Sequence, residues 1–112
     1  MPHVIVEYSA NLEEDVSPRD LIDRIHATIL ATGVYPIGGV RVRAERRDLY
    51  AIADRDPSHA FCAILIRMGT GRDEATRRRV SQDVLATLAD VTAEAFKKRG
   101  LSLSVEIQEI DE

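Results

Sequence analysis

The chain has 112 residues, of which 45% are hydrophobic and 30% are charged, and these proportions are typical of a globular protein with one modest core. A net charge of −4 argues against general nucleic-acid binding, and no apolar run approaches the roughly 18 residues of a membrane span. The N-terminus also lacks the basic and apolar regions of a signal peptide. We therefore expect one cytoplasmic domain over residues 1–112, with no membrane and no nucleic-acid partner.

The first half of the chain alternates between strand and helix patterns. A β-branched run at 4–8 predicts the first strand. The serine and proline at 17–18 are typical of a helix start, apolar residues then recur at helical spacing, and Gly33 ends the pattern. A turn rich in proline and glycine at 34–39 leads to a strictly alternating segment at 40–46, which predicts the second strand.

The second half repeats this order after a long loop at 48–59. The nearly continuous apolar run at 60–68 predicts the third strand, and its single cysteine, Cys62, is expected to pack in the core rather than act as a nucleophile. A second helix is predicted from an apolar stripe, which consists of Val80, Val84, Leu88, Val91 and Ala95, with Phe96 beside it. Gly100 ends this helix, and alternation at 101–109 predicts the fourth strand.

The predicted fold is α+β, in the order β-α-β-β-α-β, which also reads as a duplicated β-α-β unit. The first and third strands are apolar on both faces and should be central, whereas the second and fourth have one polar face and should be edges. Two helices cover only one face of a four-stranded mixed sheet. We expect another copy of the subunit to cover the other face.

Three chemically distinctive residues are predicted to converge at one end of this sheet. A crossover through a helix makes the second strand parallel to the first, so Pro2 and Arg41 lie at the same end. If the third strand runs antiparallel to the first, Arg72 follows it at that end too. Arginine presents a planar fork that grips carboxylates, so an anionic small molecule is the expected ligand.

Pro2 has a specific chemical use if Met1 is removed, because its nitrogen then becomes a free secondary amine. An α-amine has a pKa of about 8, and both burial and nearby guanidinium groups disfavour its protonated form. A neutral amine at physiological pH is a general base, and the arginines would stabilise an enolate that forms beside it.

The sequence resembles the tautomerase superfamily and, more narrowly, its 5-carboxymethyl-2-hydroxymuconate isomerase family. The start PHVIVEYSAN is similar to the family's PHxIVExSxN opening, and ATGVYPIGGVRVR to its ATGxFPxxGxRxR segment. AFCAILIRMGTGR is similar to its strand that ends in GxGR, and LSLSVEIQEI to its closing strand. The similarity covers nearly the whole chain, and the middle segment is its most specific part.

This resemblance implies a homotrimer with inward-facing sheets and an isomerase of homoprotocatechuate breakdown. The implied substrate is a 2-hydroxydienoate with three carboxylates, and the product is a 2-oxo-enoate with the double bond moved. Carried over residue by residue, Pro2 moves the proton between the 2-hydroxyl and C5, and Arg41 and Arg72 bind carboxylates. Arg43 is a further substrate-binding candidate, and neither a cofactor nor a metal is implied.

Two alternative functions remain open on the sequence. The same proline could serve a related dehalogenase, hydratase or decarboxylase of the superfamily. The β-α-β-β-α-β order is also that of ferredoxin-like domains, so a non-catalytic module that binds a partner or an anion is the second alternative. Among other polar residues, His3 is expected on the strand face opposite to Pro2, and no metal-ligand spacing joins His59 to Asp56.

Overall fold

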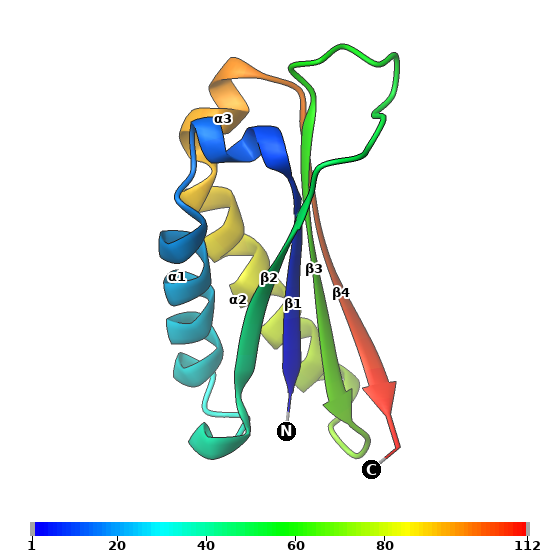
Figure 1. The fold of residues 1–112 in the computed structure, drawn as a ribbon. Helices are drawn as coiled ribbons and strands as arrows, with labels where there is room; N and C mark the ends of the chain where they lie inside the picture. The colour runs from blue at the N-terminus through cyan, green and yellow to red at the C-terminus, as the bar shows by residue number, and fades with distance from the viewer. Residues whose placement is uncertain (1, 112) are drawn as a thin grey trace.

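Figure 1 shows the computed structural model, which describes residues 2–111, with its helices gathered on one face of a twisted sheet. The strands are β1 (His3–Ser9), β2 (Arg41–Arg47), β3 (Ala60–Gly69) and β4 (Leu101–Ile110). The helices are α1 (Pro18–Ala31), α2 (Glu74–Val91) and α3 (Ala93–Lys98), with short 3₁₀ turns η1 (Ala10–Glu14) and η2 (Ile37–Gly39). Among the described residues no helix combines the length and apolar character needed to cross a bilayer.

The sheet order is β2-β1-β3-β4, which confirms that the two most apolar strands are central and the two alternating strands are edges. β1 is parallel to β2 and antiparallel to β3, and β3 is parallel to β4. The predicted α+β class with a mixed sheet is therefore confirmed. The starts of β1 and β2 and the ends of β3 and β4 all lie at the lower end of Figure 1.

The helices begin where the sequence predicts and bury the expected stripes. The Ser17 hydroxyl accepts a hydrogen bond from the Asp20 backbone N–H at 3.2 Å and caps α1. The buried side chains of α1 are Leu21, Ile25 and Ile29, and those of α2 are Val80, Val84 and Leu88. They form one core with Val4 and Val6 of β1, and each such side chain contributes roughly 1.5–3 kcal/mol of apolar burial.

The second helix differs from its predicted form because it is interrupted at Thr92. The buried Thr92 hydroxyl donates to the carbonyl of Leu88 at 2.7 Å, and its backbone leaves the helical region (φ −98°, ψ 9°). A hydroxyl that bonds back to the fourth preceding carbonyl bends a helix. The separate helix α3 then ends at Lys98, and Phe96 is 55% exposed.

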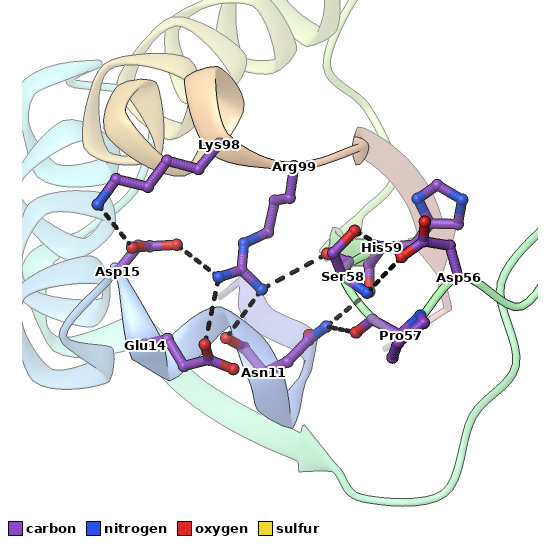
Figure 2. A network of polar contacts seen from close by, with 9 residues as sticks. All are labelled: Asn11, Glu14, Asp15, Asp56, Pro57, Ser58, His59, Lys98 and Arg99. Carbon is purple, nitrogen blue, oxygen red and sulfur yellow. Dashed lines mark hydrogen bonds and ion pairs between the residues drawn. The ribbon is translucent and has the colours of Figure 1, made fainter.

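A polar network at the upper end of Figure 1 fastens the long loop 48–59 to the rest of the fold, as Figure 2 shows from close by. Asn11 donates to the carbonyl of His59 at 2.6 Å and to that of Pro57 at 3.3 Å. Arg99 and Asp15 form an ion pair at 2.8 Å, although only 9% and 7% of their side chains are exposed. The network therefore joins η1, α3 and the loop at the end opposite to Pro2.

The sheet face opposite to the helices, here called the open face, has no element of the described chain over it. Alternation places the odd-numbered residues of β1 on this face, because the even-numbered ones are buried under the helices. Its middle is a hollow of about 250 Å³, lined by Ile5, Glu7, Glu45, Ala63, Ile64, Leu65, Ser104 and Glu106. Acidic side chains therefore line this hollow together with the apolar side chains of the central strands. A cover by another subunit stays a prediction.

Candidate active site

Pro2 lies at the end of the sheet where β1 and β2 begin. It is buried, and its carbonyl accepts a hydrogen bond from the backbone N–H of Arg41 at 3.1 Å. The proline precedes the first residue of β1, where a missing N–H removes no bond from the ladder. The backbones of Pro2 and Arg41 are therefore neighbours, as the predicted strand directions require.

The side of β1 on which Pro2 is buried is the apolar side. Pro2 alternates with the fully buried Val4 and Val6, and His3 pairs with Arg67 across β3. The antiparallel register continued by one residue puts Pro2 opposite Met68, which is also fully buried. An amine at this position would lie at the apolar end of the core, where a positive charge is disfavoured.

Arg72 is held near this apolar end by the ring of Tyr35. The guanidinium carbon of Arg72 lies 4.8 Å from the ring centroid, and its Nη1 donates to the carbonyl of Gly69 at 3.4 Å. The Tyr35 hydroxyl in turn contacts the sulfur of Met68 at 3.6 Å. Burial raises the pKa of the Tyr35 phenol, so the ring stays neutral and presents its face to the cation.

The loop that carries Arg72 is fixed from two directions. The Nη1 of Arg77, in the first turns of α2, donates to the backbone carbonyl of Arg72, and the same group lies 3.9 Å from Glu109 of β4. Gly71 has a φ of +108°, which glycine adopts without strain, and this turn directs the chain from β3 into α2. The position of Arg72 therefore depends on β4 and α2 as well as on its own strand.

Arg41 and Arg43 lie at the same end but extend toward the open face. Arg41 donates through Nη1 to the carbonyl of Gly38 at 2.9 Å, and Arg43 Nη1 lies 3.2 Å from Nδ1 of His3. Pro2 and Arg72 are thus associated with the helix side of the sheet end, and Arg41 and Arg43 with its open side. The four predicted site residues surround one end of the sheet instead of lining one face.

His3 faces away from Pro2, on the open face, as predicted. Burial lowers the pKa of its imidazole, and the charges of three arginines lower it further, in the order Arg43, Arg67 and Arg41. The imidazole is therefore neutral at physiological pH. Its Nδ1 can accept from Arg43, which leaves Nε2–H as a donor.

Sequence reasoning missed Tyr35 and Arg77, which position Arg72. Tyr35 belongs to the turn 34–39, where the pattern predicts only a change of direction. Arg77 opens a run of three arginines that resembles an ordinary solvated helix face. Tyr35 lies within the resemblance segment 31–43, which was the available signal for it, but its contact with Arg72 joins residues far apart in the sequence. Arg77 follows the segment that ends at Arg72, and no pattern distinguishes it from its arginine neighbours.

The remaining candidates support no second chemical centre. Cys62 is fully buried, and burial raises the pKa of its thiol to about 12, which confirms its predicted place in the core. His59 Nε2 lies 2.7 Å from a carboxylate oxygen of Asp54. Over residues 2–111, no group of three His, Cys, Asp or Glu side chains is placed to hold a metal ion.

The comparisons with known proteins match almost the whole chain. A family model described as 5-carboxymethyl-2-hydroxymuconate isomerase matches residues 2–112. The 5-carboxymethyl-2-hydroxymuconate Delta-isomerase of Escherichia coli is 31% identical over 110 residues, which cover 98% of this chain and 87% of that protein.

Solved structures give the same result at the level of the fold. The crystal structure of a 5-carboxymethyl-2-hydroxymuconate isomerase from Deinococcus radiodurans R1 superposes with a TM-score of 0.91 and 38% identity. The match covers 98% of this chain and 83% of that one. A fused 4-OT symmetric trimer matches over 97% of this chain and 87% of its own at a TM-score of 0.70 and 10% identity, which relates the two folds alone.

Proposed function

Because the chain belongs to the 5-carboxymethyl-2-hydroxymuconate isomerase family, we propose that it isomerises 5-carboxymethyl-2-hydroxymuconate, with the Pro2 amine as the base. The observation that carries this proposal is the position of Pro2, which is buried at the apolar end of the core beside the start of β2. The reaction requires that Met1 be removed, since an amide nitrogen has no basic lone pair.

The proposed reaction transfers one proton and needs no oxidant or reductant. The neutral Pro2 nitrogen accepts the proton of the 2-hydroxyl, and the electrons of the broken O–H bond form the C2 carbonyl. The C2–C3 double bond shifts to a position between C3 and C4. The electron pair of the C4–C5 double bond then takes up the proton from Pro2, so that a new C–H bond forms at C5. One O–H bond is lost and one C–H bond forms, so the amine is returned neutral.

Arginines supply the binding and the electrostatic part of this proposal. Arg72 is positioned by Tyr35 on the Pro2 side, where its fork can hold a substrate carboxylate. Arg41 and Arg43 stand at the same sheet end without a carboxylate partner among the described residues, and they are proposed to bind further carboxylates. Fixed guanidinium groups also stabilise the negative charge of the dienolate while the proton is on Pro2.

We also propose that the active form is a homotrimer whose sheets face inward. Support comes from the uncovered open face, from the free edges of β2 and β4, and from the similarity in fold to fused 4-OT symmetric trimers. We propose that the reaction is a cytoplasmic step of homoprotocatechuate breakdown, with a small polycarboxylate as its substrate. Each subunit is proposed to consist of a single domain over residues 1–112.

Turnover by protein of known N-terminus tests the proposal. Protein whose intact mass excludes Met1 should rapidly remove the ultraviolet absorbance of the dienol substrate. The same chain with an added N-terminal residue, which converts the Pro2 amine to an amide, should lose about 10²–10⁴-fold in rate. Pro18→Ala is the matched control, because Pro18 opens α1 and lies outside the site.

Two results would contradict this assignment of the base. The first is full activity in the N-terminally extended protein with its fold intact. The second is loss of activity in Pro18→Ala equal to that in the extended form. Processed protein that leaves this substrate unchanged but converts a related halogenated or 2-oxo acid would support the alternative superfamily reactions.

A further inference from the structure

The arginines of this chain divide into two groups according to their partners. Those with a carboxylate oxygen within 4.0 Å, mostly outside the Pro2 end, are Arg19, Arg24, Arg46, Arg47, Arg77, Arg78 and Arg99. Six others meet no carboxylate in the described part of the chain. Arg55 lies in the loop 48–59 and Arg79 on α2, whereas the other four belong to the strands and loop at the Pro2 end of the sheet. They are Arg41, Arg43, Arg67 and Arg72.

Arg67 is the member of this second group that the proposed catalytic set does not use. In the strand register it lies directly opposite His3, which in turn lies opposite Arg41. Arg67 is also opposite Gln108 of β4. Arg41, His3, Arg67 and Gln108 therefore form one row across the open face of the sheet, and none of these four residues is acidic. Arg43 reaches the same row through its contact with His3.

The electrostatics of this row are unfavourable unless an anion is present. Three guanidinium groups surround a single imidazole, and no carboxylate among the described residues lies within 4.0 Å of these guanidinium groups. The Nε of Arg67 is buried and has no hydrogen-bond partner among the described residues. A buried N–H without a hydrogen-bond acceptor costs free energy, particularly on a charged group. A ligand that offers an acceptor oxygen to this N–H would remove that cost.

Burial is the largest cause of the lowered pKa of His3, and the positive charges of Arg43, Arg67 and Arg41 lower it further, which is consistent with this picture. The groups that face His3 across the sheet are Arg41, Arg43 and Arg67, and the row ends in the uncharged Gln108. A carboxylate that entered the row would accept from a guanidinium fork and from the free imidazole N–H.

We infer that Arg67 and His3, together with Arg41 and Arg43, form a carboxylate-binding row on the open face that anchors one carboxylate of a polycarboxylate substrate. This inference rests on the proposed function for the identity of the ligand, and it adds Arg67 as a residue that determines specificity. Pro2 and His3 are consecutive, so the row borders the sheet end where the proton transfer is proposed. A substrate with a third carboxylate is then distinguished from one that lacks it.

Binding of a non-reacting probe tests the row separately from catalysis. Tricarballylate, a small tricarboxylate, is titrated calorimetrically into the processed chain and into the N-terminally extended chain. Both should bind it, and Arg67→Gln should raise the dissociation constant about 10-fold or more in each. Arg67→Lys, which keeps the charge but not the fork, should give an intermediate value and covers the case in which Arg67→Gln fails to fold.

Arg79→Gln is the matched control for charge, since Arg79 also lacks a carboxylate partner among the described residues but donates to the Thr32 carbonyl from α2. Its affinity for the probe should stay within 2-fold of the unmodified chain. In the nuclear magnetic resonance titration of His3, the probe should raise the imidazole pKa in the unmodified chain and not in Arg67→Gln.

Three outcomes would overturn the inference. They are unchanged affinity in Arg67→Gln, equal loss in Arg79→Gln, and no probe binding together with a changed oligomer size in Arg67→Gln. The last would assign the row to a subunit contact. The processed protein could fail to isomerise the dienol while probe binding still depends on Arg67. That result would contradict the proposed function and support the anion-binding row.

Discussion

The guanidinium carbon of Arg72 lies 4.8 Å from the centroid of the Tyr35 ring, and this contact joins the loop after β3 to the turn before β2. Tyr35 is buried, and its hydroxyl contacts the sulfur of Met68. The ring thus links the Arg72 guanidinium to the core, in addition to the backbone contacts that fix its loop. Each end of the contact lies in one of the segments that carry the family resemblance.

Tyr35→Leu should therefore weaken substrate binding more than it slows the chemical step. Loss of a cation–π contact costs about 1 kcal/mol, so we expect KM for the dienol substrate to rise about 5-fold, with a smaller change in kcat. Tyr35→Phe retains the ring and should remain within about 2-fold of the unmodified enzyme. An unchanged KM in a folded Tyr35→Leu protein would show that the ring does not position Arg72.

Gly100→Ala should destabilise the fold. A Cβ on Gly100 would lie 2.6 Å from Nδ1 and 3.1 Å from Cε1 of His59, whose ring is held by Asp54. Displacing the ring costs about 1–3 kcal/mol of unfolding free energy, which denaturant titration measures. Gly38→Ala is the control and should change stability by less than about 0.5 kcal/mol, because nothing lies within 4 Å of its added Cβ.

A double variant separates this steric cost from other effects at Gly100. If the His59 ring is the obstacle, Gly100→Ala should cost much less in a His59→Ala background than in the unmodified chain. Equal costs in the two backgrounds would mean that the contact with His59 is not the cause.

The carboxyl of Asp15 should contribute to the acid sensitivity of the protein. The hydrogen bond from Lys98 and the charge of Arg99 hold its pKa below the ordinary 3.8. Because the pKa in the folded state is depressed, the carboxyl stabilises the fold fully above pH 3.8, and this contribution disappears as the pH falls through the folded value. The unmodified chain should therefore be more stable than Asp15→Asn at pH 7.

The measurement is the difference in unfolding free energy between these two proteins as a function of pH. It should be constant between pH 5 and 7 and shrink steadily below about pH 4, because both proteins then carry an uncharged group at this position. A difference that is the same at pH 7 and pH 2.5 would contradict the assigned pairing.

Cys62 should be unreactive in the folded protein. The side chain is fully buried and its thiol has a pKa of about 12, so almost no thiolate forms at pH 8. A thiol-specific chromogenic disulfide should react with Cys62 only after denaturation, at a rate that follows unfolding. Immediate reaction of the native protein would mean that the core around β3 opens readily.

Local patterns in the sequence were sufficient for the four strands, for the starts of the two long helices, and for which strands are central and which are edges. Side-chain alternation separates edge strands from central ones because burial on one or two faces leaves different residue types, and β2 and β1 follow this rule. Ser17 caps α1 through a contact three residues away, which the sequence itself displays. The convergence of Pro2 and Arg41 also follows from strand direction alone.

The break at Thr92 and the partners of each arginine depended on the tertiary structure. Helical spacing continues through Thr92, and only its buried hydroxyl, bonded to Leu88, shows that the helix bends. Alternation assigns Arg67 and Arg47 to the same face, yet Arg47 meets Glu7 and Glu45 whereas Arg67 meets His3 and no acid among the described residues.

The physical reason for this division is the range over which each interaction acts. Residues near one another in the sequence form the hydrogen bonds within a helix, the helix caps and the side-chain alternation of a strand. The local amino-acid sequence therefore determines these features. The contacts that make Arg72 and Arg67 chemically distinct cross 37 and 64 positions, from Tyr35 and His3 respectively. Only the packed sheet decides which of fifteen cationic side chains remain without a carboxylate at the Pro2 end.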